Sequence, residues 1–479
     1  MRNDVVIRHT ALIILFNSGF LFISAAISGI LGENSFTPLF YSTIVAMIFG
    51  VFPLLFIPKL HDIQPKEGIF IVVSGWLVSC ILGMLPYLLW GGEFTLVNAW
   101  FESVSGFTTT GSSILTDVES LPKGLLFWRA STHWIGGIGI ILFALLIFPR
   151  TSSSRLTLIR SELSDISQKS FSAKATDIFR IILFVYIGLS LLEAISLTIA
   201  GMSVFDAITH TFATIATGGF STKNLSLAHF HSLSIEIIVM VFMVLSGLHF
   251  GLLFSTITGK RENIFRSQVI RYYLLFLVAG ILLVTLKLYI SNYGSFEENL
   301  RYASFQVISL GTTTGFATAD TASWPYFTQL ILIYFSIQCA CVGSTSGGLK
   351  FDRILILLKS IKKQVRKFLH PRAVIVNKLG KIKLSEDLEF YILTFTVLYL
   401  LVIFISTLLL SFMDVDLATS FSATIATIGN VGPGFGDVSS LNNYNALPSL
   451  AKVILSGDML MGRLELFSIL SLFYLRSWK

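Results

Sequence analysis

Charged residues are scarce in this chain of 479 residues, because Asp, Glu, Lys and Arg together make up only 13% of it. A soluble domain usually carries about 25% charged residues. Hydrophobic residues make up 54% of the sequence, and many form long apolar runs, such as those that begin at Ala11 and Ile71. A helix of about 20 apolar residues crosses a bilayer core of roughly 30 Å. The composition therefore excludes an ordinary soluble protein and predicts a polytopic membrane protein.

Cysteine is rare as well. The three copies, Cys80, Cys339 and Cys341, lie in apolar segments and form no CxxC pair, which predicts buried thiols rather than a disulfide framework. The sequence also has no GxxxxGK[ST] phosphate loop and no metal-ligand spacing of His, Cys and carboxylate residues. We therefore expect no enzyme and no cofactor in this chain, and any control by nucleotide has to come from another subunit.

A membrane enzyme remains the alternative from another functional class. It would need catalytic groups that converge, and the sequence shows no such cluster. The candidates for that role are His133, His210, His249 and Asp458.

Ten spans are predicted, of which the eighth is interrupted. They lie near residues 11–31, 38–58, 69–90, 125–148, 178–200, 233–256, 272–290, 326–369, 388–412 and 444–473. Arg2 and Arg8 precede the first run, as in a signal peptide, but the run is longer than a usual signal core, so we expect a retained helix.

The connections after even-numbered spans are basic, whereas those on the other side, such as 32–37 and 291–300, are poor in Lys and Arg. The positive-inside rule then predicts that both termini are cytoplasmic. These loops account for the net charge of +7 without a nucleic-acid partner. Their basic residues are Lys59, Lys66, Arg150, Arg155, Arg160, Lys169, Lys174, Lys260, Arg261, Arg266 and Arg271.

Four external connections contain a second, shorter apolar segment that ends in Thr and Gly. They read FESVSGFTTTGSS, ITHTFATIATGGFST, FQVISLGTTTGFAT and TSFSATIATIGNVGP. Each is too short to span and too apolar for a solvated loop, which favours a re-entrant segment buried in protein. Aligned on Gly111, Gly218, Gly315 and Gly429, they predict one supersecondary unit used four times. A single copy would be interpreted as a glycine-rich turn.

Each unit is expected to consist of a span, a short helix, an extended loop and a second span. The negative C-terminal end of the short helix attracts a cation, and glycine lets the following backbone approach its neighbours closely. Four such loops around one axis make rings of carbonyl oxygens that replace the hydration shell of K⁺. The expected N-cap residues of the short helices are Thr95, Ser203, Ser295 and Asp414.

On this alignment the expected K⁺-binding residues form four short segments. They are Thr109, Thr110, Gly111, Ser112, Ala216, Thr217, Gly218, Gly219, Thr313, Thr314, Gly315, Phe316, Thr427, Ile428, Gly429 and Asn430. A purely structural scaffold would leave the fourfold repeat of this peptide unexplained.

With these motifs, TTTGS (108–112), ATGGFS (216–221), TTTGF (312–316) and TIGNVGPGFG (427–436), the chain resembles the TrkH/TrkG/KtrB branch of the superfamily of potassium transporters over nearly its whole length. The resemblance implies an all-α polytopic fold with two N-terminal helices and four span–pore helix–span repeats in a pseudo-fourfold arrangement. The expected boundaries are 1–65 for the extension and 66–150, 151–258, 259–384 and 385–479 for the repeats.

The resemblance also implies function: channel-like K⁺ uptake across a bacterial inner membrane, in a homodimer controlled by a cytosolic nucleotide-binding subunit of TrkA/KtrA type that takes NAD, ATP or ADP. In certain plant members of this family, a serine in place of the first filter glycine accompanies Na⁺-favouring transport. All four glycines are present here, which favours K⁺, with a Na⁺-coupled or Na⁺-permeable transporter as the alternative. Ala216 in place of Thr would remove one hydroxyl from the innermost filter position.

A second break lies inside the predicted eighth span, where CVGSTSGGLK (341–350) lowers helix propensity in mid-membrane. Such a loop must line a cavity, and a simple helix kink is the alternative. The resemblance implies an intramembrane gate at 341–349, which we call the gate loop. Its expected gating residues are Gly343, Ser344, Thr345, Ser346, Gly347 and Gly348.

Arg463 lies within the last predicted span, where an unpaired arginine is costly. The resemblance implies that it forms a cationic barrier with the gate loop. A structural ion pair with Asp458 or Glu465 is the alternative, and the two roles can coexist. Arg129, His133 and Trp134 are interpreted as interfacial anchors beside close helix packing at Gly136, Gly137 and Gly139, and His249 is interpreted as a packing residue.

The basic stretch 350–383 predicts a surface for anionic lipids or for the regulatory subunit.

Overall fold

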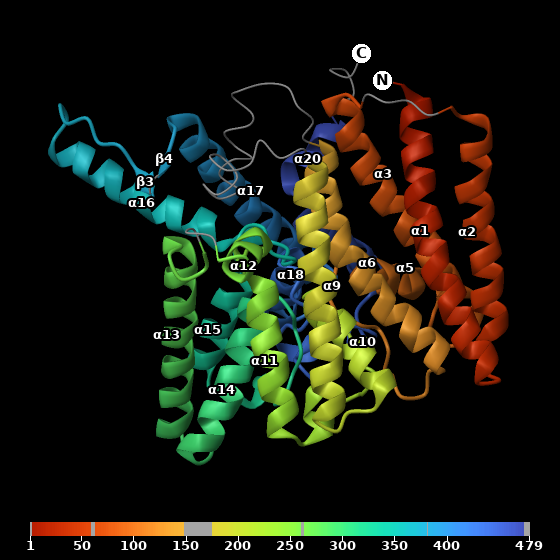
Figure 1. Ribbon diagram of the computed structural model, residues 1–479. Coiled ribbons are helices and arrows are strands. Elements are labelled where there is room, and N and C mark those ends of the chain that lie inside the picture. Colours follow the sequence, from red (N-terminus) through yellow and green to blue (C-terminus); the bar gives the residue numbers. More distant parts are fainter. Residues whose placement is uncertain (1, 59–62, 148–174, 260–262, 381, 474–479) are drawn as a thin grey trace.

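The computed structural model describes residues 2–58, 63–147, 175–259, 263–380 and 382–473. The chain is an all-α membrane protein, as predicted: long helices run lengthwise and shorter ones lie between them (Figure 1). The predicted boundary at residues 150 and 151 lies outside the described residues, as do Lys59, Arg150, Arg155, Arg160, Lys169, Lys174, Lys260 and Arg261. The other repeat boundaries stay an interpretation.

The first two helices, α1 (Asn3–Ile30) and α2 (Phe36–Phe56), form a hairpin at one side of the molecule (Figure 1). A hydrogen bond of 2.6 Å joins the Ser28 and Ser35 hydroxyls across its turn. In the same turn, the Glu33 carboxylate accepts from the backbone N–H groups of Lys123 and Gly124 at 2.9 and 3.0 Å. The hairpin is therefore fixed to the start of the helix that begins at Lys123.

Each of the four repeats contains a long helix, a short helix, an extended loop and a further helix. The first has α3 (Pro65–Gly83), α4 (Leu85–Trp90), α5 (Leu96–Phe107) and α6 (Lys123–Ile147); the second has α9 (Ala175–Ile199), α10 (Val204–Ile215), η1 (Ser226–Phe230), α11 (Leu233–Gly247) and α12 (Phe250–Ile257). The third has α13 (Gln268–Ile290), α14 (Phe296–Gly311), η2 (Thr321–Ser323), α15 (Tyr326–Ile337), β1 (Gln338–Cys339), β2 (Leu349–Lys350), α16 (Phe351–Leu369), β3 (Lys378–Leu379) and β4 (Ile382–Lys383). The fourth has α17 (Glu386–Ser411), α18 (Leu417–Ile428), η3 (Gly436–Val438), α19 (Ser449–Leu464) and α20 (Leu466–Phe473).

The predicted continuous sixth span, 233–256, is wrong. Its two halves, α11 and α12, meet at 106°, because the chain turns at Leu248 and His249 becomes the N-cap of α12. Its ring nitrogen Nδ1 accepts from the Gly251 N–H at 3.0 Å. The backbone N–H of Phe250, the residue after His249, donates to the Gly343 carbonyl at 3.1 Å. A hydrogen bond therefore joins the bend to the gate loop.

The last predicted span, 444–473, is also interrupted, since α19 ends at Leu464 and Glu465 has φ +63°. In the eighth, α15 is only 12 residues long, and the parallel pair β1–β2 follows it. Beyond this pair, α16 projects sideways from the end of the molecule at which α1 begins and α20 lies (Figure 1). The predicted break at 341–349 is therefore confirmed, and α16 lies outside the helical body.

Three of the four predicted N-caps are confirmed. The hydroxyls of Thr95, Ser203 and Ser295 accept from the N–H three residues on, at 3.3, 3.1 and 3.3 Å. The fourth prediction, Asp414, is wrong: Asp416 caps α18 and accepts from the Thr419 N–H at 3.0 Å. This hydrogen bond to the charged form holds the pKa of Asp416 below its usual value.

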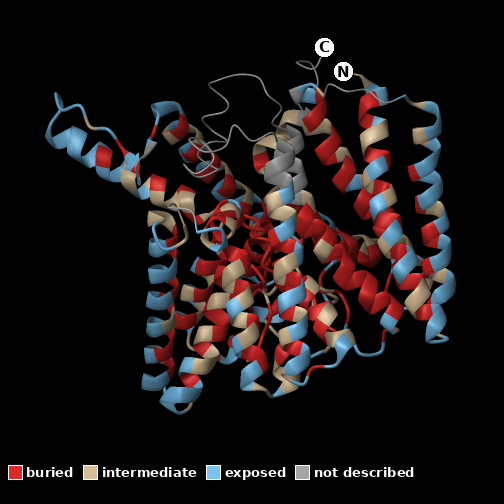
Figure 2. Cartoon of the chain, in the orientation of Figure 1, coloured by how far each residue is buried: buried red, intermediate tan, exposed pale blue. Residues whose placement is uncertain are grey.

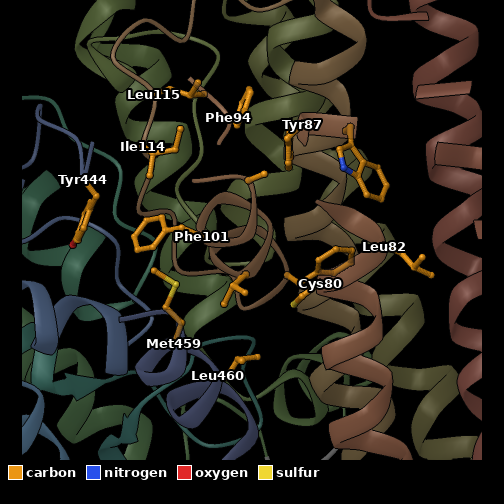
Figure 3. Close-up of a cluster of buried hydrophobic side chains, with 14 of the residues drawn as sticks. Cys80, Leu82, Tyr87, Phe94, Phe101, Ile114, Leu115, Tyr444, Met459 and Leu460 are labelled. Carbon is orange, nitrogen blue, oxygen red and sulfur yellow. The ribbon is translucent and has the colours of Figure 1, made fainter. Parts of the chain in front are cut away.

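Buried residues gather at the centre of the molecule, and exposed ones follow the outward faces of the helices (Figure 2). The exposed residues of α17 are mainly apolar, with Phe404 64% exposed, as suits a face in contact with lipid. Near the centre, Phe101 of α5 lies against Tyr444, with ring centroids 5.4 Å apart, and both belong to a core cluster with Cys80 and Met459 (Figure 3). This cluster joins the first repeat to the fourth.

All three cysteines are free and buried, as expected.

Candidate functional site

Each short helix ends in the same turn. In the first repeat, the Thr109 N–H donates to Gly106 O at 3.1 Å and the Thr110 N–H to Ser105 O at 2.9 Å. This pair of bonds is the Schellman pattern, which satisfies the last carbonyls of a helix. The same two bonds recur from Thr217 and Gly218, from Thr313 and Thr314, and from Asn430 and Val431.

The turn places a residue with a side chain in the left-handed region. Thr109, Thr217, Thr313 and Asn430 have φ of 53°, 57°, 63° and 53°. Asn tolerates this conformation, but for β-branched Thr it is an outlier that costs on the order of 1–3 kcal/mol. Strain repeated at three equivalent positions indicates a functional constraint on the backbone here.

Four glycines, one from each repeat, then bring the extended peptides into contact. Gly111, Gly219, Gly315 and Gly432 have φ between 81° and 101°. A Cβ on each would lie 2.0, 2.1, 2.0 and 2.6 Å from a carbonyl oxygen of the next repeat. Those oxygens belong, in the same order, to Gly218, Thr314, Val431 and Thr110. Because the last contact returns to the first repeat, the four peptides form a closed ring that only glycine permits.

This ring corrects the predicted register. Gly218 and Gly429 are not equivalent to Gly111; Gly219 and Gly432 are. The equivalent segments, which we call the ring peptides, are 109–112, 217–220, 313–316 and 430–433. The alignment by Thr-x-Gly failed because the turn residue of the fourth repeat is Asn430 rather than Thr, which moved the apparent match three residues toward the helix.

Four of the expected K⁺-binding residues therefore lie before the ring. Thr427 and Ile428 are the last residues of α18, Gly429 is its C-cap, and Ala216 is the C-cap of α10. The positions equivalent to Ala216 are the C-caps Thr108, Thr312 and Gly429. The hydroxyl that Ala216 lacks would therefore lie at a helix end, outside the ring peptides.

The ring is lined by neutral oxygen atoms. Thr109, Thr217 and Thr313 are fully buried, and the hydroxyl oxygens of Thr109 and Thr313 have no hydrogen-bond partner among the described residues. The described residues also contain no group of three or more His, Cys, Asp or Glu side chains that could hold a metal. Neutral carbonyl and hydroxyl oxygens, together with the negative ends of four short helices, favour a weakly hydrated monovalent cation.

The gate loop lies against the helical ends of the ring peptides. A Cβ at Gly347 would lie 2.2 Å from the Asn430 side-chain oxygen. On another side, the Thr345 hydroxyl donates to the Ile215 carbonyl, at the end of α10, at 3.0 Å. Thr345 and Ser346 are fully buried. The loop is therefore packed below the ring, next to the fourth and second repeats.

Two cationic side chains bind carbonyls of this loop. Arg463 donates to Thr345 O at 2.5 Å and to Gly136 O of α6 at 2.9 Å. Lys350 donates to the carbonyl and hydroxyl of Ser346. Sequence reasoning missed Lys350, although its place directly after the loop at membrane depth was a usable signal.

The alternative ion pair of Arg463 is not what the structure shows. Glu465 accepts from Arg353 at 2.5 Å, and Asp458 accepts from the Ser406 hydroxyl at 2.9 Å. Both predicted carboxylate partners are thus engaged elsewhere.

The interpretation of Arg129 and His133 as interfacial anchors is wrong, because both are buried, with exposed fractions of 3% and 0%. Polar groups of the first and second repeats form hydrogen bonds with both side chains, which the sequence alone could not reveal.

The expected close packing at Gly136 is confirmed: a Cβ there would lie 2.0 Å from Phe107 O. Helix α6 therefore lies directly behind the ring.

A ring of four re-entrant peptides, each between long apolar helices, defines this molecule as a membrane protein that moves cations. A model of the TrkH family, described as cation transport proteins, matches residues 39–478. The chain belongs to this family, which is a family of transporters and not of enzymes. The resemblance inferred from the motifs is confirmed.

Named relatives are similar over most of the chain. The Trk system potassium uptake protein TrkH of Escherichia coli K12 is 34% identical and covers 100% of both chains. The Trk system potassium uptake protein TrkI of Halomonas elongata is 32% identical over 87% of this chain and 85% of its own. The crystal structure of the potassium transporter TrkH from Vibrio parahaemolyticus matches with a TM-score of 0.89 at 30% identity, covering 98% of each chain.

Proposed function

We propose that this chain is the pore subunit of a Trk-type potassium uptake system in a bacterial inner membrane. K⁺ loses its water in the ring of ring-peptide oxygens and passes inward. The observation that carries this proposal is the cyclic approach of Gly111, Gly219, Gly315 and Gly432 to the next repeat's carbonyl oxygen. The full-length relatives named as potassium uptake proteins support the choice of ion.

Na⁺-coupled or Na⁺-permeable transport is the alternative. The family resemblance associates Na⁺ preference with serine at a filter glycine, and in the structural register all four positions carry glycine. This favours K⁺, and the competition experiment below separates the two ions.

The gate loop closes the pathway below the ring in this proposal. It lies against Asn430 and the end of α10, and Arg463 holds it through Thr345 O. A fixed guanidinium at this depth also repels cations from a pathway that holds no ion. Gly343, Ser344, Thr345, Ser346, Gly347 and Gly348 thus form the moving element.

Partners are proposed at the face that carries α16. Its Ile361, Val365 and Phe368 are 54%, 55% and 87% exposed and alternate with Lys362 and Arg366. An apolar stripe flanked by basic residues suits anionic lipid headgroups or an acidic surface of a nucleotide-binding regulatory subunit of TrkA/KtrA type. A homodimer is proposed from the family resemblance.

The test is the substitution Gly315→Ser, with ⁸⁶Rb⁺ uptake measured in cells that lack other potassium uptake systems. A side chain at Gly315 is strained at φ +81° and meets Val431 O, so the ring has to open. We expect uptake to fall at least about tenfold, the factor set by 1.4 kcal/mol, and Na⁺ to compete more strongly.

Gly201→Ser is the matched control, because Gly201 has φ +99° but nothing within 4 Å of an added Cβ. It carries the same kind of backbone strain without crowding the ring, so its selectivity should equal that of the wild type. Unchanged uptake and Na⁺ competition in a well-folded Gly315→Ser protein would refute the assignment of the ring as the filter.

A further inference from the structure

We infer that Arg129, acting through Glu102, is a positioning residue that sets ion selectivity by tying the first ring peptide to the second. This inference rests on the proposed function of the ring as a filter. It concerns a buried ionic connection behind the ring, on α6, that touches neither the gate loop nor Arg463.

The first end of the connection lies in the first repeat. Arg129 Nε donates to Glu102 Oε1 at 2.5 Å, and the two side chains are 3% and 0% exposed. Glu102 also accepts from the Ser113 hydroxyl at 3.0 Å and from the Ile114 N–H at 3.0 Å. These two residues directly follow the ring peptide 109–112, so the carboxylate holds the outer end of that peptide against its own short helix.

The second end lies in the second repeat. Arg129 NH1 donates to the Ser221 carbonyl at 3.0 Å, and its guanidinium carbon lies 3.6 Å from the centre of the Phe220 ring. Phe220 is the last residue of the ring peptide 217–220. A planar guanidinium can make both contacts at once, because it offers several donors in one plane and a face for stacking.

His133, one turn further along α6, makes a second link between the same two repeats. Its Nδ1 lies 2.8 Å from Gly106 O, and its Nε2 accepts from the Phe220 N–H at 3.2 Å. The accepting Nε2 requires a neutral ring with the proton on Nδ1. The imidazole also stacks on Phe220, with centroids 4.1 Å apart, so Phe220 is held between two side chains of α6.

The other junctions between ring peptides are built from neutral groups in the described part of the chain. Tyr444 links the fourth to the first, because its hydroxyl donates to Gly432 O at 2.7 Å and its backbone N–H donates to Ser113 O at 2.8 Å. Ser440 links the fourth to the third, donating to Ala319 O at 3.0 Å. Ser226 links the second to the third, accepting from the Ala317 N–H at 3.2 Å.

A charged connection at one junction has a physical consequence. Charge-assisted hydrogen bonds are shorter and roughly twice as strong as neutral ones, and a buried charge that loses its partner is strongly destabilising. The spacing between the first and second ring peptides is therefore held more stiffly than the other three. In a ring where size and oxygen placement decide which ion binds, this junction is where a small displacement changes selectivity most.

Arg129→Lys is the deciding variant. Lysine keeps the positive charge opposite Glu102, but a compact ammonium cannot also bind Ser221 O and stack on Phe220. We expect Na⁺ to inhibit ⁸⁶Rb⁺ uptake at roughly 5- to 10-fold lower concentration than in the wild type, the size of effect of one lost charge-assisted hydrogen bond. Phe220→Leu, which leaves the ion pair intact, should shift the competition in the same direction and serves if Arg129→Lys does not reach the membrane.

The matched control is Arg301→Lys. Arg301 donates to both carboxylate oxygens of Glu236 at 2.7 Å and also links the second and third repeats, but away from the ring peptides. It should lower thermal stability without changing Na⁺ competition. Wild-type competition in folded Arg129→Lys and Phe220→Leu proteins, with Gly315→Ser still altered, overturns the inference and leaves the filter standing. If Gly315→Ser is also unaltered, the filter assignment itself fails.

Discussion

At the scale of single residues, the ring depends on backbone conformations that most side chains avoid. Threonine occupies the left-handed turn position in three repeats and asparagine in the fourth. A hydrophobic protein has no packing reason to place threonine there. The conformation is maintained because the two Schellman bonds and the neighbouring ring peptides over-determine it.

The sequence predicted three of the four N-caps correctly, but not the register of the ring peptides. Thr95, Ser203 and Ser295 were identifiable as caps because a hydroxyl before an apolar segment has one common use. Asp416 was missed because Asp414 stands two residues away and is an equally good cap by type. Arg129 was misinterpreted because Glu102, its partner, lies far away in sequence, and nothing in either segment shows the pairing.

Arg463 provides a test at this scale. Replacing it by alanine removes two hydrogen bonds that hold Thr345 O and Gly136 O, and it removes a fixed positive charge below the ring. Hydrogen bonds from charged groups are worth about 1.5–3 kcal/mol, so basal ⁸⁶Rb⁺ flux should rise roughly tenfold or more. Flux equal to the wild type in folded Arg463→Ala protein, measured in liposomes, would show that Arg463 is only structural.

At the scale of elements, the breaks in the helices share one location, next to the gate loop. The bend between α11 and α12, the pair β1–β2 and the end of α19 all surround the gate loop. Phe250 N–H bonds to Gly343 O, and Gly348 N–H bonds to Gly462 O at 3.2 Å. The interruption in the eighth span could be predicted from its glycines and serines. The other two could not be predicted in this way, because they depend on contacts with the loop that the sequence does not show.

Shortening the gate loop tests this element. Deleting residues 343–348 removes every contact that the loop makes with Asn430 and Ile215, so basal flux should rise well above that of the wild type. Thr345→Val keeps the loop length and removes only the hydroxyl's bonds to the Ile215 and Ser246 carbonyls, so it should give an intermediate increase. Flux at or below the wild-type level in both folded variants, measured in the same liposome assay, would rule out a gating role.

At the scale of the whole molecule, burial is arranged as a membrane protein requires. Polar threonines, serines and the Glu102–Arg129 pair are central, while large apolar side chains such as Phe404 and Phe412 are 64% and 84% exposed on the outside. The composition predicted this class. The closure of the first repeat on the fourth, through Phe101 and Tyr444, needed the structure, because more than three hundred residues separate the two rings in sequence.

The orientation of the molecule in the membrane is the last prediction. The start of α1, α16 and α20 lie at one end, and the turn between α13 and α14 lies at the other (Figure 1). Because α16 carries Lys359, Lys362 and Arg366, the positive-inside rule places its end in the cytoplasm. A green fluorescent protein fused after Lys479 should therefore fluoresce, whereas alkaline phosphatase inserted after Tyr293 should be active because it folds only outside the cytoplasm. The reverse pattern, an inactive phosphatase after Tyr293 and a dark C-terminal fusion, would invert the topology and with it the proposed side of the gate loop.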